Sequence, residues 1–168
     1  MPALPPLLSA ETLDRVVRHA RINGMWVLVG STTLALLSAA GGEVPKVAVW
    51  LLAAGTGAMA LHGGALLNQG YSRGINWLVS AQLFCLAFIL AYCGWQLRHA
   101  DLAPLREAMT AEMRASVKQT GLTDEEFLLL SYRLTYALFA FIATLYLGCM
   151  TLYYQRRRSV VIAALTEE

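Results

Sequence analysis

One ionisable side chain lies inside a long run of small residues. Residues 53–65 read AAGTGAMALHGGA, and His62 is the ionisable residue among them. A phosphate-binding loop of the GxxxxGK type needs a lysine at a fixed offset, but the chain has no lysine between Lys46 and Lys118. HGG also occurs in the oxyanion loop of some esterases, but we expect no nucleophile elbow to accompany it here. The run is therefore predicted to be a membrane helix with a smooth face.

Four polar residues in apolar stretches are candidates for an intramembrane polar site: His62, Asn76, Ser80 and Thr144. An ionisable residue inside a membrane suggests a function by default. The alternative for His62 is an interfacial histidine bonded to a backbone carbonyl or a headgroup. The alternative for Asn76 and Ser80, as for Gln82, is a hydrogen bond between helices.

Arg133 and Tyr136 form a second candidate, a site for an anion or a lipid headgroup. Arginine offers bidentate geometry to a carboxylate or a phosphate. Arg133 heads a helical stripe that continues through Ala137, Ala140, Thr144, Gly148, Thr151, Gln155 and Arg158. The alternative is that Arg133 extends to the membrane interface and pairs with Asp124 or Glu126.

The remaining chemistry-bearing residues give no catalytic or metal-binding pattern. Cys85, Cys93 and Cys149 all fall inside apolar runs, at no metal-ligand spacing, and are interpreted as small buried hydrophobes. A haem would lack axial ligands, because no second histidine accompanies His62 at bilayer depth. We therefore expect no metal, no cofactor and no enzymatic activity.

The elements that position these residues follow from composition. Hydrophobic residues make up 57% of the 168 and charged residues only 14%, where a soluble domain has about a quarter. Residues 47–72, 74–97 and 134–155 hold no Asp, Glu, Lys or Arg. Runs of about 20 apolar residues span a bilayer of about 30 Å. The sequence predicts spans at about 25–41, 47–67, 75–96 and 134–154, within a membrane domain of residues 24–158.

Three polar segments flank these spans. Residues 1–23 are predicted to form a tail and an amphipathic helix on the membrane surface, with Leu13, Val16, Val17 and Ala20 on its apolar face. Residues 97–126 are predicted to form a helical hairpin, in which Leu105, Met109, Met113 and Val117 recur every four residues. Residues 159–168 are predicted to be a C-terminal tail.

Two sequence signals concern the ends of helices. Thr123 and Glu126 match a capping box, which predicts a helix that runs unbroken into the fourth span. SAAGG at 38–42, preceded by basic and apolar residues, also matches a cleaved secretory signal. The polar region ahead of that apolar run is long for a signal, and we prefer the uncleaved interpretation.

Lysine and arginine predict the orientation in the membrane. Basic residues flank the chain at positions 15–21 and 156–158, and Arg73 lies between the second and third spans. With four spans, all three groups lie on one side. We expect both termini in the cytoplasm and the hairpin 97–126 outside it.

The spans are predicted to pack through small residues. In the second span, Ala53, Gly57, Ala60 and Gly64 fall within about 60° of one another on a helical wheel, with Leu52, Met59 and Leu66 on the far side. Asn76, Ser80, Ala87, Ala91 and Gly94 form the equivalent stripe of the third span. Such a bundle leaves little room for a water path within one subunit, so any pore is expected between subunits.

Together these features predict an all-α membrane bundle of four spans, with an N-terminal interfacial helix and an extracytoplasmic helical hairpin. The expected function is a non-enzymatic subunit or scaffold of the cell membrane, or the inner membrane of a bacterium. The alternative is a homo-oligomeric channel or small transporter lined partly by the fourth span. Expected partners are membrane lipids and another membrane protein or further copies of this chain. A net charge of +2 without a recognisable motif argues against nucleic acid.

Overall fold

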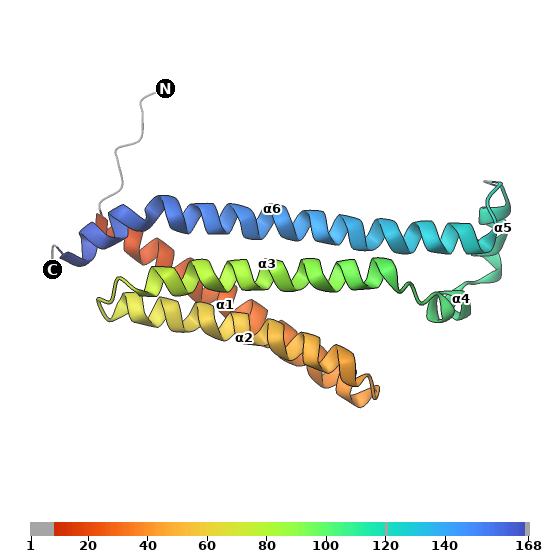
Figure 1. The fold of residues 1–168 in the computed structure, drawn as a ribbon, viewed down its shortest axis with the longest axis horizontal. Helices are drawn as coiled ribbons and strands as arrows, with labels where there is room; N and C mark the ends of the chain where they lie inside the picture. The colour runs from red at the N-terminus through yellow and green to blue at the C-terminus, as the bar shows by residue number, and fades with distance from the viewer. Residues whose placement is uncertain (1–8, 120, 167–168) are drawn as a thin grey trace, which may run out of the picture. The chain divides into compact units, whose positions relative to one another are not determined.

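The computed structural model describes residues 9–119 and 121–166, which form an all-α chain (Figure 1). Its helices are α1 (Ser9–Ala40), α2 (Val44–Asn68), α3 (Gly74–Arg98), α4 (Ala103–Ala108), α5 (Ala111–Gln119) and α6 (Asp124–Thr166). Among the described residues, four helices are long and apolar enough to cross a membrane, namely α1, α2, α3 and α6. This confirms the predicted fold class, an all-α membrane bundle with four spans.

The chain divides into two compact units. The first unit comprises Met1–Phe88 and Tyr146–Glu168, and the second comprises Ile89–Leu145. The first therefore holds α1, α2, the start of α3 and the end of α6. The second holds the end of α3, the short helices α4 and α5, and the start of α6.

All four long helices contribute to the core of the first unit. Its buried members are Val16 and Ala20 of α1, Ala60 and Leu67 of α2, Ile75, Leu78 and Ala81 of α3, and Tyr154 and Val161 of α6. The N-terminal part of α1 and the C-terminal part of α6 thus lie at the same end of this unit.

The predicted interfacial helix and first span are one helix, α1. It runs from Ser9 to Ala40 without a break, because no proline interrupts it and Gly24 is held against α2. Val16 and Ala20, predicted to face the membrane surface, are 0% exposed and lie in the protein core. The prediction of a separate interfacial helix is corrected accordingly, and the predicted tail 1–8 lies outside the described residues.

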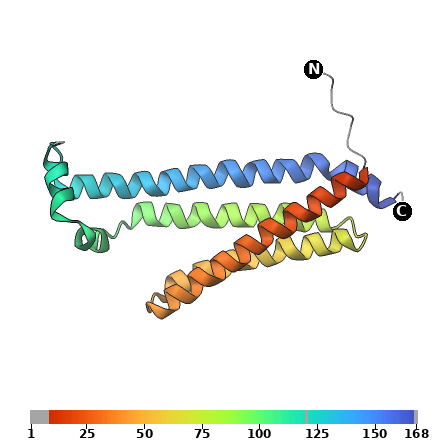
Figure 2. The ribbon, with the colours of Figure 1, turned by 180° about the vertical axis from the view of Figure 1, so that it is seen from behind.

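The α1 and α2 backbones approach each other very closely at Gly57. A Cβ at this position would lie 2.6 Å from the Leu28 backbone nitrogen and 2.8 Å from the Gly24 carbonyl oxygen. Figures 1 and 2 show these two helices running antiparallel alongside each other. Glycine at position 57 is therefore required by the space available.

The far side of α2 differs in part from the prediction. Leu52 is 58% exposed, as expected, but Leu66 is only 6% exposed. The turn into α3 folds back over this end of α2, and the Tyr71 N–H donates to the Leu66 carbonyl at 2.9 Å. A helical wheel of α2 alone carries no sign of this turn.

Helix α6 runs unbroken from Asp124 to Thr166, as its first residues predict. The Glu126 N–H donates to Thr123 Oγ1 at 3.3 Å, and the Thr123 N–H donates to Glu126 Oε2 at 3.0 Å. These bonds complete the predicted capping box, and the bonds from the Thr123 backbone and hydroxyl lower the pKa of the Glu126 carboxyl. Glu126 precedes the charge-free run 134–155 and therefore lies outside the predicted fourth span.

The length of α6 exceeds the thickness of a bilayer. Its 43 residues extend about 65 Å, against about 30 Å for the hydrocarbon layer. The helix therefore continues beyond the charge-free run at both ends. Residues 159–166, predicted to be a tail, are helical because Val161 and Ala164 are buried against the bundle.

In the second unit, the predicted hairpin consists of α4, α5 and the start of α6. Met109 has an extended backbone, with ψ of 111°, and separates the two short helices. Its side chain is buried with Val117 and Leu128, whereas Leu105 and Met113 are 39% and 47% exposed. The break between α4 and α5 places the Met109 side chain in this small core. Gly121, with φ of +77°, then supports the turn into α6.

Candidate functional site

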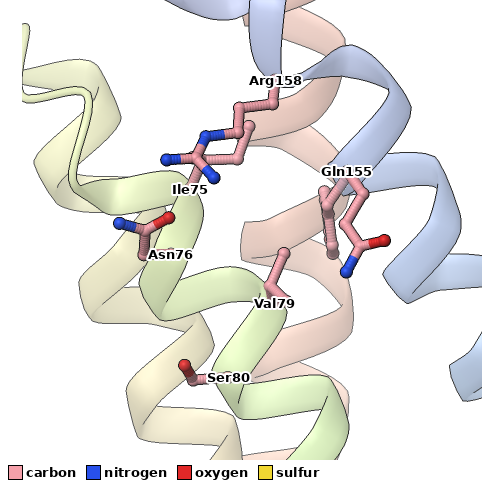
Figure 3. A pocket seen from close by; sticks show the side chains of 7 residues that line it. Ile75, Asn76, Val79, Ser80, Gln155 and Arg158 are labelled. Atoms are coloured by element: carbon pink, nitrogen blue, oxygen red, sulfur yellow. The ribbon is translucent and has the colours of Figure 1, made fainter.

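Two predicted site residues, Asn76 and Ser80, line the same cavity in the first unit. The cavity has a volume of about 250 Å³. Ile75, Asn76, Val79 and Ser80 of α3 form one wall, and Tyr154, Gln155 and Arg158 of α6 form the other. Figure 3 shows Arg158 leaving α6 and reaching toward the first turn of α3, where Asn76 lies.

Helical spacing explains why these residues share one cavity. Asn76 and Ser80 are four residues apart in α3, and Tyr154 and Arg158 are four apart in α6, so each pair lies on one side of its helix. The start of α3 is fixed against α2, because a Cβ at Gly74 would lie 2.5 Å from the Gly63 carbonyl oxygen. This contact sets the position of Asn76 relative to the bundle.

The cavity combines one cation with neutral polar groups and an apolar wall. Arg158 is exposed and has no ion-pair partner among the described residues. Asn76 and Gln155 supply amides, Ser80 supplies a hydroxyl, and no lining residue is acidic. These groups are complementary to an anion that carries hydrogen-bond acceptors.

Tyr154 adds a buried hydroxyl to the same cavity. Its side chain is 0% exposed, and its hydroxyl has no hydrogen-bond partner in the described part of the chain. Leaving a buried polar group unpaired costs about 1–3 kcal/mol. Tyr154 therefore forms part of the cavity wall, and its hydroxyl is enclosed in the core of the first unit.

In the second unit, Tyr136 belongs to a tyrosine cluster. Its ring centroid lies 4.8 Å from that of Tyr132 and 6.1 Å from that of Tyr92. The Tyr132 hydroxyl donates to Gln96 Oε1 at 2.6 Å, and Gln96 Nε2 donates to the Tyr92 hydroxyl at 2.8 Å. This network joins the end of α3 to α6.

Arg133 is exposed beside the tyrosine cluster. The structure gives it no ion-pair partner within the residues it describes, and Glu126 bonds Thr123 instead. The alternative pairing of Arg133 with Asp124 or Glu126 is therefore not formed. The candidate anion site at Arg133 and Tyr136 stays a prediction.

His62 and Thr144 both face outward. The His62 ring meets the Trp77 ring edge-on, with centroids 5.0 Å apart. Aromatic side chains are enriched at membrane interfaces, and His62 with Trp77 fits such a position. The Thr144 hydroxyl donates to the Ala140 carbonyl of its own helix at 2.7 Å, as is common for a threonine in a membrane helix.

Gln82 is a separate buried polar residue in the first unit. It is 3% exposed, and its Oε1 has no hydrogen-bond partner among the described residues. It lines a cavity of about 10 Å³ together with Asn23 and Thr56. This volume is near the smallest that accepts one water molecule, so the site suits a water and excludes an organic ligand.

The turn between α2 and α3 contains a sequence match that was not expected. GYSRG at 70–74 has the spacing of the GxSxG nucleophile motif. That motif requires a sharp turn from a strand into a helix, and the described residues contain no strand. Ser72 lies instead in a turn between two helices, so the match carries no catalytic geometry.

The described residues contain no group of three or more His, Cys, Asp or Glu side chains that could hold a metal ion. No protein-family model, curated protein or solved structure matches the chain.

Proposed function

We propose that this integral membrane protein is a non-enzymatic subunit or scaffold that acts through helix–helix and lipid contacts. The observation that carries the proposal is the low internal burial of the spans. In the apolar stretch that defines each candidate span, only 17–28% of the residues are buried. Most of the apolar surface is thus left for lipid or for other membrane helices.

Several small residues on this uncovered surface support contacts with a partner helix. A Cβ built at Gly30, Gly55, Gly94 or Gly148 would meet no atom within 4 Å. Small residues in membrane helices allow another backbone to approach closely. A partner helix would use the space that these glycines leave.

We propose a cell-membrane location with both termini in the cytoplasm. The N-terminal part of α1 and the C-terminal part of α6 share one core, so their basic segments lie at one end of the first unit. An excess of Lys and Arg favours the cytoplasmic side. We propose no cofactor and no nucleic-acid partner for this protein.

The alternative function is a homo-oligomeric channel or small transporter lined partly by α6. The exposure of Arg133 and Thr144 favours it, since both side chains are open to contact with another copy. A pore of this kind would form between copies.

Purification in mild detergent from the native membrane separates the two functions. The subunit role predicts a complex that contains a second, different membrane protein, and no solute flux when the purified chain alone is placed in liposomes. A symmetric assembly of this chain alone that conducts solute in liposomes would replace the subunit role with the channel.

A further inference from the structure

We propose that the cavity between α3 and α6 binds the phosphate ester of an anionic phospholipid headgroup. The site is the cavity of about 250 Å³ lined by Asn76, Ser80, Tyr154 and Arg158 among others. This inference deepens the lipid-contact part of the proposed function. Its test is separate from the test for a protein partner.

Arg158 supplies the charge that selects an anion. Its guanidinium offers the planar pair of N–H groups that fits two phosphate oxygens. No acidic side chain lines the cavity, and Arg158 has no ion-pair partner among the described residues. An entering phosphate would therefore not have to displace a carboxylate.

Tyr154 supplies a buried polar group in the wall of the same cavity. Its hydroxyl is fully buried, has no partner in the described structure, and belongs to a residue that lines the cavity. An ester or phosphate oxygen that reaches this hydroxyl would accept a hydrogen bond from it. Ligand binding would thus relieve the cost of an unpaired buried hydroxyl.

The position along the helices favours a lipid over a soluble phosphate ester. Asn76 is the third residue of the charge-free run 74–97, and Arg158 lies three residues beyond the run 134–155. The cavity therefore lies where both helices leave the hydrocarbon layer. Basic pockets between membrane helices at this level are suited to anionic headgroups.

The apolar wall fits the same assignment. Ile75 and Val79 line the cavity beside the polar groups, and Figure 3 shows both on the α3 side that faces α6. A headgroup would place its phosphate at Arg158 and its glycerol near Ser80, with the first acyl carbons along Val79. The volume is below the range of about 300–1,000 Å³ for whole small-molecule ligands, so the acyl chains would remain in the bilayer.

The test is native mass spectrometry of the full-length protein, titrated with phosphatidylglycerol or phosphatidylcholine. Inorganic phosphate is added in a separate titration as a soluble competitor. We expect the wild type to retain phosphatidylglycerol over phosphatidylcholine. Because hydrogen bonds to charged groups are the stronger ones, Arg158→Gln should weaken retention about tenfold. Arg156→Gln is the matched control, since Arg156 is an exposed cation two residues away that does not line the cavity.

Two further variants keep the test decisive. Arg158→Lys keeps the charge and should give intermediate retention, even if Arg158→Gln folds poorly. Tyr154→Phe should reduce retention while leaving thermal stability unchanged or raised, because it removes a hydroxyl that has no partner.

Equal retention by Arg158→Gln and Arg156→Gln would overturn the proposal, as would equal retention of the two lipids by the wild type. Displacement of the lipid by millimolar inorganic phosphate would overturn the lipid assignment. None of these results bears on whether a second protein co-purifies with the chain.

Discussion

Gly57 of α2 and Leu28 of α1 are in backbone contact, with only 2.6 Å between the Leu28 nitrogen and the point where a Cβ of residue 57 would lie. Real side chains do not occupy such positions without displacing a neighbour. The neighbour here is backbone, which cannot rotate aside as a side chain can. The α1–α2 pair therefore depends on the absence of a single methyl group.

The first prediction compares two glycines of α2. Gly57→Ala should destabilise the protein by about 1–3 kcal/mol through overpacking. Gly55→Ala is the control, because a Cβ there meets nothing within 4 Å, and it should be neutral or stabilising by about 0.5–1 kcal/mol. The melting temperature in detergent measures both. Equal melting temperatures for the two variants would refute the close approach.

Gly64 is expected to behave differently from Gly57, although both lie on the predicted small stripe. A Cβ at Gly64 would lie 3.4 Å from the Ala20 Cβ, which is ordinary van der Waals contact. Gly64→Ala should therefore be tolerated, with a melting temperature close to that of the wild type. A drop in melting temperature as large as that of Gly57→Ala would mean that the helices lie closer at Gly64 than the structure shows.

The tyrosine network of the second unit gives the next prediction. Tyr132→Phe removes the 2.6 Å hydrogen bond to Gln96 Oε1 and should cost about 1 kcal/mol. Faster amide hydrogen exchange in residues 92–98 and 128–136 would report the loss. Tyr71→Phe serves as the control, since Tyr71 is 52% exposed in a turn. Unchanged exchange in Tyr132→Phe would show that the network does not hold these helices together.

The capping box predicts a local effect at the start of α6. Thr123→Ala should cost about 0.5–2 kcal/mol of helix stability and speed hydrogen exchange over residues 124–130. Because the pKa of the Glu126 carboxyl is lowered in the folded protein, its contribution to stability is fully present above the pKa that this carboxyl has in the unfolded chain. That contribution is lost as the pH falls through the lower folded pKa. Exchange at residues 124–130 that does not change in Thr123→Ala would contradict the cap.

Orientation is tested by labelling single cysteines in intact cells with an impermeant thiol reagent. Glu11→Cys and Ser159→Cys should stay unlabelled until lysis, because both termini are proposed to be cytoplasmic. Glu107→Cys, in α4 of the proposed extracytoplasmic hairpin, is the positive control and should be labelled in intact cells. The reverse pattern would invert the proposed orientation.

The sequence predicted the spans and the start of α6 because those features are local. Charge-free runs mark the hydrocarbon-spanning stretches, and Thr123 with Glu126 forms a cap within four residues of chain. Val16 could not be placed in the same way. An apolar residue on an amphipathic helix suits a membrane surface or a protein core equally, and only the fold shows that Val16 lies in the core of the first unit.

The face of α6 that packs was harder to predict. The expected stripe passes through Thr144, Gly148 and Thr151, of which only Thr151 is buried. Other buried positions of α6 lie off this stripe, among them Ala143, Leu147 and Tyr154. In a membrane helix, the sides that face lipid and protein are both apolar, so small residues need not mark the side that packs within the chain.

The candidate cavity was predicted only in part, for a similar reason. Asn76 and Ser80 are identifiable as polar residues in an apolar run. Their approach to Arg158 depends on how α3 and α6 pack, across about 80 residues of intervening chain, and no spacing within one helix contains that information. The unpaired hydroxyl of Tyr154 is likewise visible only once its surroundings are known.

If the chain works as a subunit through its uncovered small-residue positions, the complex extracted from the native membrane has a mass that includes a second protein. Native mass spectrometry should show the 18.3 kDa chain bound to a different membrane protein. Gly94→Leu or Gly148→Leu, which fill open positions, should release that partner from a still-folded chain. A complex built of this chain alone, or one that both leucine variants leave unchanged, would contradict the claim.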